Sequence, residues 1–248
     1  MTIDLRLGRW QDVLADVECD ALICDPPYGS RTHSGHDAGV DHSSSGDPRW
    51  DTARRRDLNY GHWTPDDVRE FVQAWHPRTR GWFCAMSCSD LAPVWRAELA
   101  AVGRTTFQPV ACVIKAMSVR LSGDGPSSWV VYLNVARPKA LSKWGTLDGA
   151  YYDKEYVFPP AYVVGRGTIG HIGGKPLDLM NAIVRDYAKR GDVVCDPVAG
   201  YASTLVAATG NGCSAIGAEV DPETYASAMQ RIGKGIQIDM FGGGVASP

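Results

Sequence analysis

Residues 175–233 read KPLDLMNAIVRDYAKRGDVVCDPVAGYASTLVAATGNGCSAIGAEVDPETYASAMQRIG, and this stretch decides the fold class. Its apolar residues alternate between helical spacing and short continuous runs. The predicted elements are, in chain order, a helix over 176–191, a strand over 191–197, a helix over 202–212, a strand over 213–222 and a helix over 222–233. This alternation is typical of a doubly wound α/β fold, a mostly parallel sheet with helices on both faces.

The first part of the chain continues this pattern less regularly. Strands are predicted over 3–7, 20–24, 81–88, 105–115 and 128–136, and helices over 64–75 and 89–103. Residues 30–63 are polar and lack hydrophobic periodicity, which predicts a functional lid or a disordered segment. Residues 137–170, rich in Tyr, Trp, Gly and Pro, are predicted to be irregular. We expect a single domain over 1–248, with the loop 30–63 near the substrate.

The composition is that of an ordinary globular protein, with 44% hydrophobic and 21% charged residues. No apolar run is long enough to cross a bilayer and the N-terminus is polar, so we expect a cytoplasmic protein without a membrane partner. The seven cysteines form no CxxC pair, which favours buried reduced thiols over disulfides or a zinc site. The net charge of −3 neither indicates nor excludes nucleic-acid binding, because phosphate affinity comes from a local patch.

The tetrapeptide Asp25-Pro26-Pro27-Tyr28 follows the apolar run 20–24 directly. The amino group of a nucleobase is a poor nucleophile because its lone pair is delocalised into the ring. The Asp25 carboxylate and the Pro26 carbonyl could accept the amino hydrogens, and the prolines would hold that carbonyl in place before substrate arrives. Tyr28 offers a flat face for a base flipped out of its duplex. The alternative is that the tetrapeptide only ends a strand in a rigid turn.

A second group of residues lies at the two strand ends of the quoted stretch. Residues 196–203 (DPVAGYAS) join a predicted strand to a helix, and their small side chains would let a ligand approach the backbone N–H groups of the helix start. Glu219 ends the next strand, at a spacing that suits an acid accepting hydrogen bonds from ribose hydroxyls. A glycine in such a turn is often only structural. Together, however, these features favour a nucleoside-cofactor site.

These motifs, in this order, resemble the β-class of DNA amino-methyltransferases, the N6-adenine and N4-cytosine enzymes. DPPY matches the catalytic motif, DPVAGYAST the cofactor loop usually written DPFxGSGTT, and HIGGKP (171–176) the H-x-x-x-KP run. The resemblance is convincing over 3–30 and 171–233 and loose between them. It implies a Rossmann-like methyltransferase sheet with circularly permuted motif order, and S-adenosyl-L-methionine as cofactor.

The resemblance also implies the roles of individual residues. The catalytic residues are Asp25, Pro26, Pro27 and Tyr28. The cofactor-binding residues are Arg9, Trp10, Cys24, Asp25, His171, Lys175, Pro176, Asp196, Pro197, Val198, Ala199, Gly200, Tyr201, Ala202, Ser203, Glu219 and Val220. No metal is required.

Three features depart from the family pattern. Ala202 stands where the loop usually has its second glycine, which leaves less room, although a methyl group should fit. Arg9 stands where an Asp usually follows Gly8, so an adenine contact would be lost or supplied by another residue such as Asp12. Finally, only about fifty residues (120–170) can serve as a small target-recognition insertion, which favours modest specificity or sharing with the loop 30–63.

Duplex DNA is the expected partner, and the sequence leaves a homodimer open. Candidate phosphate contacts are Arg54, Arg55, Arg56, Lys139 and Lys143, with solvated surface charge as the alternative. Trp50, Tyr60 and Trp63 could stack on bases or simply pack. His33, His36 and His42 lack the Cys or carboxylate partners of a metal site.

The expected function is therefore transfer of a methyl group from S-adenosylmethionine to the exocyclic amine of a flipped base in DNA. Adenine N6 is favoured and cytosine N4 is the alternative; the resemblance also points to restriction–modification systems. Other hypotheses are an RNA or protein amide methyltransferase and a catalytically silent nucleic-acid-binding relic, which Arg9 and Ala202 would fit. An NAD-dependent oxidoreductase is disfavoured because no GxGxxG follows the strand at 192–196.

Overall fold

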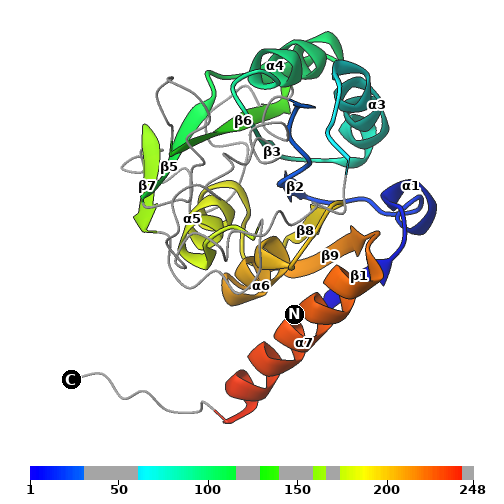
Figure 1. The fold of residues 1–248 in the computed structure, drawn as a ribbon, viewed down its shortest axis with the longest axis vertical. Coiled ribbons are helices and arrows are strands. Elements are labelled where there is room, and N and C mark those ends of the chain that lie inside the picture. The colour runs from blue at the N-terminus through cyan, green and yellow to red at the C-terminus, as the bar shows by residue number, and fades with distance from the viewer. Residues whose placement is uncertain (31–60, 116–128, 140–158, 166–173, 242–248) are drawn as a thin grey trace, which may run out of the picture.

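A computed structural model describes residues 1–30, 61–115, 129–139, 159–165 and 174–241, and the account below is confined to them. A single nine-stranded sheet runs through these residues, with strand order β1-β9-β8-β2-β3-β6-β5-β7 and with β4 paired to β6 (Figure 1). Segments from both ends of the chain therefore share one sheet.

Five neighbouring strands of the sheet run parallel to one another. They are β1 (Ile3–Leu7), β9 (Ser214–Glu219), β8 (Val193–Asp196), β2 (Ala21–Cys24) and β3 (Phe83–Ser87). Strand β6 (Val130–Pro138) is antiparallel to β3 and also to β4 (Arg104–Thr106) and β5 (Val110–Lys115). Strand β7 (Ala161–Gly165) pairs in parallel with β5. All strands parallel to β2 end at one edge of the sheet, called the carboxyl edge below.

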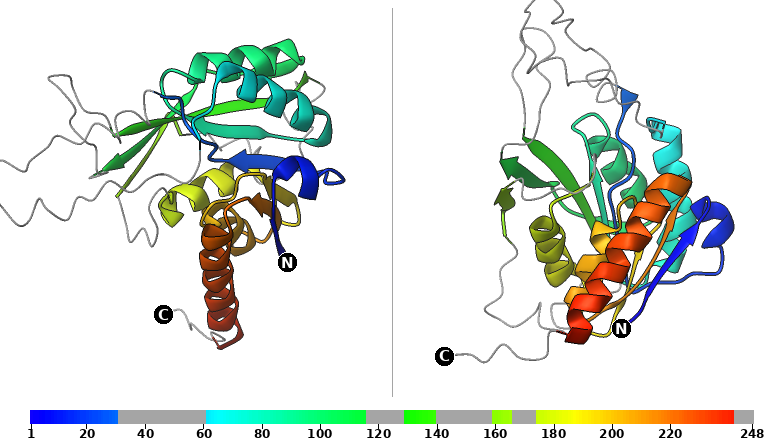
Figure 2. Two further views of the ribbon diagram at one scale, coloured as in Figure 1. Left: turned by 45° about the vertical axis from the view of Figure 1, so that its right-hand side comes forward. Right: turned by 60° about the horizontal axis from the view of Figure 1, so that its bottom comes forward.

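Helices cover both faces of the sheet, as Figure 2 shows in its edge-on view. One face carries α1 (Trp10–Val13), α3 (Pro65–Trp75), the short 3-10 helix η2 (His76–Arg78) and α4 (Ala92–Ala101). The other carries α5 (Leu177–Tyr187), α6 (Ser203–Gly210) and the long α7 (Pro222–Phe241). The predicted doubly wound, mostly parallel architecture is confirmed.

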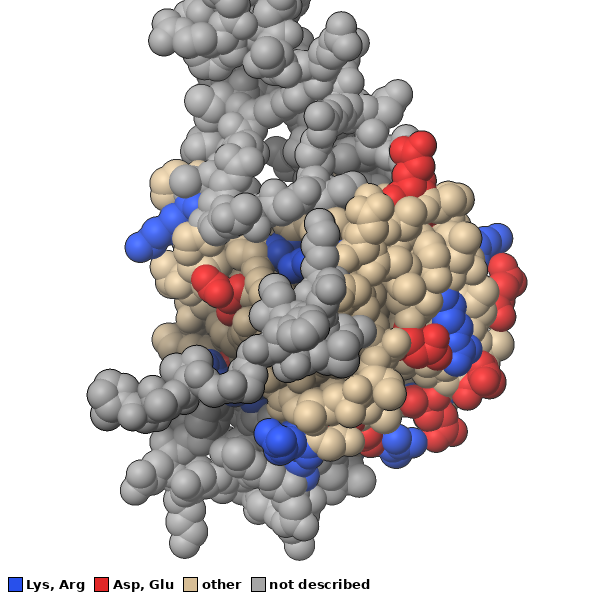
Figure 3. Space-filling model, turned by 90° about the horizontal axis from the view of Figure 1, so that it is seen from below, with Lys and Arg blue, Asp and Glu red and all other residues tan. Residues whose placement is uncertain are grey.

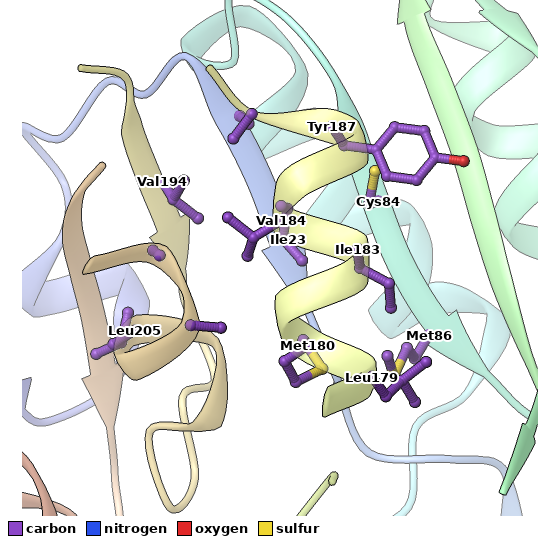
Figure 4. Close-up of a cluster of buried hydrophobic side chains, with 14 of the residues drawn as sticks. Ile23, Cys84, Met86, Leu179, Met180, Ile183, Val184, Tyr187, Val194 and Leu205 are labelled. Atoms are coloured by element: carbon purple, nitrogen blue, oxygen red, sulfur yellow. The ribbon is translucent and has the colours of Figure 1, made fainter. Parts of the chain in front are cut away.

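Two apolar cores lie on either side of the sheet. On the α5 face, Leu179, Met180 and Ile183 point towards Ile23 of β2 and Met86 of β3 (Figure 4). On the α3 face the core is aromatic, with Phe71, Trp75 and Trp95 fully buried and Trp10 and Trp63 packed against Phe71. Apolar side chains alternate between the two faces along β2 and β3, as expected for a strand covered on both sides.

Most of the predicted elements are present, with boundaries moved by a few residues. The helix predicted over 64–75 is α3, and Thr64 caps it: its hydroxyl accepts from the Asp67 N–H at 3.3 Å while Asp67 accepts from the Thr64 N–H at 2.7 Å. Helix α5 ends at Tyr187 rather than at the predicted Gly191. Helix α7 continues to Phe241, beyond the predicted end at 233.

Two predictions in the middle of the chain were wrong. The strand predicted over 105–115 is divided into β4 and β5 around Pro109, which lacks the N–H that a continuous strand would need. The segment 137–170, predicted to be irregular, begins with the end of β6 and contains β7. The short run Ala161–Gly165 is bounded by Pro160 and a glycine, a strand signal that is hard to separate from loop at this length.

Within the described residues, no helix is long and apolar enough to cross a membrane. All seven cysteines are free, and six of them are buried. The loop 30–63 and the insertion 120–170 fall largely outside the described residues, so their predicted roles, like the single-domain boundary and the permuted motif order, remain predictions.

Gly217 marks a point where the fold tolerates no side chain. A Cβ there would lie 2.7 Å from the Asp196 carbonyl oxygen and 3.1 Å from both Ala199 Cβ and Leu205 Cδ1. We expect Gly217→Ala to lower the free energy of unfolding by about 1–3 kcal/mol, measured by chemical denaturation, because β8 and the loop after it must shift.

Gly233→Ala on α7 is the matched control, since its Cβ would meet no atom within 4 Å. Replacing a helical glycine by alanine should raise stability by up to about 1 kcal/mol. Equal effects of the two variants would contradict the close packing at Gly217.

Candidate functional site

The Asp25 carboxylate stands at the end of β2 and binds two side chains. The Tyr28 hydroxyl donates to Oδ1 at 2.9 Å, and the Lys175 ammonium donates to Oδ2. Only 22% of the Asp25 side chain and 12% of the Lys175 side chain are exposed. DPPY is thus in contact with Lys175 of the predicted cofactor-binding residues, 150 residues further along the chain.

Tyr28 lies beneath the same ammonium group. Lys175 Nζ is 5.1 Å from the centroid of the Tyr28 ring, close enough for a cation–π interaction. Burial, followed by the charge of Asp25, raises the pKa of the Tyr28 hydroxyl, which therefore remains a hydrogen-bond donor. Tyr28 orients Asp25, and its predicted stacking on a base stays a prediction.

The loop after β8 has a backbone shape that explains its small residues. Gly200 and Ala202 both adopt positive φ, 51° and 58°, and Ala202 is the residue before α6. A Cβ on Gly200 would meet no atom within 4 Å, so the backbone there borders open space. The left-handed conformation of Ala202 explains why the family usually has glycine at this position. This conformation costs a residue with a side chain about 1–2 kcal/mol, and glycine avoids that cost. Its methyl group fits as expected, fully buried in the core under α5 and α6.

Glu219 is held at the end of β9, next to this loop. Its Oε1 accepts from the Asp221 N–H at 2.8 Å, and burial raises the pKa of its carboxyl group. The Ala199 N–H donates to the Ala218 carbonyl at 2.8 Å, which ties the loop to β9. The Gly8 N–H donates to the Glu219 carbonyl at 2.9 Å, bringing the end of β1 to the same place. The structure therefore brings together the predicted loop, acid and opening segment.

Asp196 is the most buried acid of this edge. Only 2% of it is exposed, and the Val198 N–H donates to its Oδ1 at 3.2 Å. Burial first, and then the negative charges of Asp25 and Glu219, raise its pKa to about 7. Three carboxyl groups thus influence one another at the carboxyl edge, an arrangement that favours a cationic ligand.

Some predicted cofactor residues point elsewhere. The Cys24 side chain is fully buried in the core under α3 and α4, so only its backbone faces the edge. The Trp10 ring packs 5.3 Å from Phe71 and 6.1 Å from Trp75, which makes it mainly a core residue. Arg9 and Val220 are exposed. Sequence position alone could not separate these backbone and packing roles from side-chain binding.

One residue that the sequence reasoning missed supports the site from behind. Arg231 of α7 donates from Nη1 to the Tyr201 carbonyl and to Ser203 Oγ, both at 2.8 Å, and its Cζ lies 4.8 Å from the Tyr201 ring centroid. Ser203 Oγ in turn donates to the Lys175 carbonyl at 3.1 Å. Arg231 sits in a predicted helix, and no sequence spacing links it to residues 30 positions earlier.

The remaining predicted residues are not at the site or are not described. His171, Arg54, Arg55, Arg56 and Lys143 lie outside the described residues, as do Trp50, Tyr60 and His33, His36 and His42. Within the described residues there is no group of three His, Cys, Asp or Glu side chains that could hold a metal ion.

Lys139 is described, and it lies at the wrong end of its strand for contact with Asp25. Asn134 of β6 is level with Cys24 of β2 through β3, and Lys139 follows five residues later towards the opposite edge. That separation is about 16 Å along the strand. The structure does not bring Lys139 to the site, and its role as a phosphate contact stays a prediction.

Comparison with known proteins agrees with this geometry. The family model described as DNA methylase, of the N6/N4 methyltransferases, matches residues 134–230. Residues 134–230 are thus similar to the DNA methylase family. The matched region contains the Lys175-Pro176 pair, the loop after β8 and Glu219, whereas Asp25 and Tyr28 precede it. No curated protein sequence matches the chain.

Solved structures share its fold across nearly the whole chain. The M1.HpyAVI–SAM complex is 18% identical, with a TM-score of 0.65 over 93% of this chain and 100% of that one. TTHA0409 of Thermus thermophilus, a proposed DNA modification methylase solved with S-adenosyl-L-methionine, is 17% identical, with a TM-score of 0.59 over 95% of each chain. PvuII DNA methyltransferase, cytosine-N4-specific, is 12% identical, with a TM-score of 0.61 over 96% of this chain and 92% of that one. At these identities the likeness establishes the Rossmann-like methyltransferase fold.

Asp196 gives this site a measurable pH dependence. Its pKa of about 7 in the folded protein lies above the ordinary 3.8, so the folded protein holds a proton that the unfolded chain has released. The stability that this proton contributes is complete below about pH 4 and is lost as pH rises through about 7.

Asp196→Asn cannot titrate, so its stability should fall less than that of the wild type between pH 4 and 8, by about 2–4 kcal/mol. Chemical denaturation at both pH values measures the difference. Asp16→Asn, whose side chain is 82% exposed, is the control and should follow the wild type. Parallel curves for wild type and Asp196→Asn would contradict the burial of an ionisable Asp196.

Proposed function

We propose that this protein is an S-adenosylmethionine-dependent DNA methyltransferase that acts on the exocyclic amine of a flipped base. The observation that carries the proposal is the contact between Asp25 and Lys175, which joins the DPPY acceptor to the cofactor half at one edge of the sheet. The match of residues 134–230 to the DNA methylase family supports the same chemistry and partner. Two proteins of similar fold, M1.HpyAVI and TTHA0409, were solved in complex with S-adenosylmethionine.

The residues at the carboxyl edge suit this cofactor. Glu219 offers carboxylate oxygens for ribose hydroxyls, and the open space at Gly200 lets a ligand approach the loop backbone. Asp25 and Glu219, joined by Asp196 once it ionises above about pH 7, would place negative charge near a bound sulfonium cation. Lys175, Pro176 and the loop 196–203 would surround the methionine end. When bound, S-adenosylmethionine supplies the methyl group, whose bond to sulfur breaks as its bond to the amine nitrogen forms.

The protein's own contribution is to prepare the amine. Asp25 and the Pro26 carbonyl accept the amino hydrogens, which concentrates the lone pair on the nitrogen that attacks. The methylated nitrogen then gives up one proton to the Asp25 carboxylate. Tyr28 donates to Asp25 Oδ1 and so keeps the carboxylate in a fixed orientation, while its ring offers the stacking surface for the base.

Adenine N6 is the proposed target because Asp precedes the two prolines, with cytosine N4 as the alternative. The fold itself does not discriminate, since the similar PvuII enzyme is cytosine-N4-specific. The methylated base therefore has to be identified chemically.

Methylation of DNA by the purified protein tests this function. Duplex DNA of mixed sequence is incubated with labelled S-adenosylmethionine and digested to nucleosides, and we expect N6-methyladenine. Asp25→Asn should lower the rate at least about 100-fold, because the amide offers one weaker acceptor. Asp16→Asn, which alters an exposed acid, is the control.

Each other result has a definite meaning. N4-methylcytosine would identify the alternative base, and label in RNA or protein but not DNA would change the substrate class. Binding of S-adenosylmethionine without transfer to any of them would identify a silent relic.

The strands β5 and β6 indicate where DNA would lie. Trp129 precedes Asn134 by five residues, so it stands about 16 Å beyond the level of Cys24, on the side towards the carboxyl edge. Trp129 is 46% exposed, and its carbonyl accepts from the Ile114 N–H at 3.0 Å, next to exposed Lys115. We propose that this pair forms the rim of the site, because an aromatic ring and a cation are suited to contact with a nucleic acid.

The surface charge is consistent with local rather than extensive phosphate contact. In Figure 3, basic and acidic side chains are interspersed over the described part of the face that is shown. A few well-placed cations such as Lys115 would then matter more than the net charge of −3.

Two exposed lysines near the ends of neighbouring strands test this placement. Lys115→Ala should weaken binding to duplex DNA several-fold and lower the slope of log affinity against log salt by about 0.9. Lys139→Ala is the matched control, because Lys139 lies at the opposite edge. Fluorescence anisotropy over a salt series measures both, and a larger effect of Lys139→Ala would contradict the proposed DNA face.

A further inference from the structure

The place on Asp25 that the target amine would need is taken by a side chain of the protein itself. Tyr28 donates to Oδ1, and Lys175 donates to Oδ2. An ammonium group resembles the exocyclic amine of a base, because both are nitrogen groups that can donate more than one hydrogen bond. In the free protein Lys175 therefore makes the hydrogen bond that the proposed function assigns to the substrate.

Lys175 cannot keep this position unchanged during methyl transfer. The attacking nitrogen becomes positively charged as its bond to carbon forms, and a fixed ammonium on the same carboxylate would oppose that charge. The same ammonium is favourable before the base arrives, because it neutralises a carboxylate of which only 22% is exposed. The contact therefore stabilises the site before the base binds and disfavours the transition state of methyl transfer.

We propose that Lys175 is a positioning residue that holds the Asp25 carboxylate aligned through an ion pair in the free protein and gives up its place to the amine of the entering base. This inference rests on the proposed function and adds an exchange step to it. Lys175 would then act on Asp25 as well as surround the cofactor.

The backbone of Lys175 is anchored in a way that permits such an exchange. Its carbonyl accepts from Ser203 Oγ at 3.1 Å, and Ser203 Oγ accepts from Arg231 at 2.8 Å. The loop after β8 and helix α7 thus hold the main chain of Lys175, so that only its side chain has to rotate. The Tyr28 ring, 5.1 Å from Nζ, offers the ammonium a second favourable contact.

Lys175 brings a positive charge into contact with the Asp25 carboxylate. Besides Lys175, the titratable groups Tyr28, Asp196, Cys24 and Cys112 interact with Asp25. These groups are neutral or acidic. Removing the ammonium takes away the positive charge that contacts the Asp25 carboxylate, and loss of an adjacent opposite charge disfavours the ionised form of a carboxyl group.

The pH dependence of methyl transfer tests the exchange. We compare wild type, Lys175→Met and Lys175→Arg by kcat/KM for duplex DNA from pH 5 to 9 at saturating S-adenosylmethionine. In Lys175→Met the acidic limb of the profile should move up by about 1 pH unit or more, whereas Lys175→Arg should keep the wild-type limb because it retains the charge. A uniform loss of rate in Lys175→Met, with the limb unmoved, would overturn the proposal.

A second measurement needs no activity. The melting temperatures of Asp25→Asn, Lys175→Met and the double variant form a cycle at pH 7. We expect Lys175→Met to lower the melting temperature of the wild type clearly and to change that of Asp25→Asn little. Equal changes in both backgrounds would overturn the contact.

The two experiments also separate this inference from the function on which it rests. If the wild type methylates no DNA while the melting-temperature cycle shows coupling, the proposed function fails and the contact between Lys175 and Asp25 stands. If the wild type methylates DNA but neither the limb nor the cycle responds to Lys175→Met, the function stands and the exchange is wrong.

Discussion

The parallel pairing of β2 with β8 is the contact on which the arrangement of the site depends. Ala21 pairs with Val194 and Leu22 with Cys195, although the two strands are more than 170 residues apart in the chain. Asp20 reinforces the start of this pairing, with its N–H donating to the Val193 carbonyl at 2.9 Å and its Oδ2 accepting from the Val193 N–H at 2.8 Å. Because both strands run in the same direction, the residues that follow them, Asp25 and Asp196, emerge at the same edge.

This alignment brings several acidic side chains close together, so that their negative charges repel one another. Burial, together with the negative charges of Asp25 and Glu219, raises the pKa of Asp196 to about 7. The Lys175 ammonium compensates part of this charge in the free protein. A site that binds one internal cation in the absence of ligand is suited to a cationic cofactor and to a reaction that develops positive charge on nitrogen. The fold thus supplies electrostatics as well as position.

Much of this was accessible from local sequence patterns. The strand and helix periods in 175–233 predicted β8, α6 and β9, and the apolar run before Asp25 predicted β2. Local patterns failed where pairing partners decide the outcome. Strand β7 is short and gains its hydrogen bonds from β5, and the break at Pro109 depends on β6 serving both β4 and β5. The direction of β6 places Lys139 at the edge opposite Asp25, which its position in the sequence did not indicate.

The sequence by itself determined the chemistry that is available: an acid before two prolines, a small-residue loop after a strand, and an acid at the next strand end. These are local features, because a turn or a strand end depends on neighbouring residues. Only the tertiary structure decided that Lys175 contacts Asp25, that Arg231 supports the loop, and that Trp10 and Cys24 belong mainly to the core. Such contacts join residues from distant parts of the chain, and they follow from strand order and direction, which no local spacing encodes.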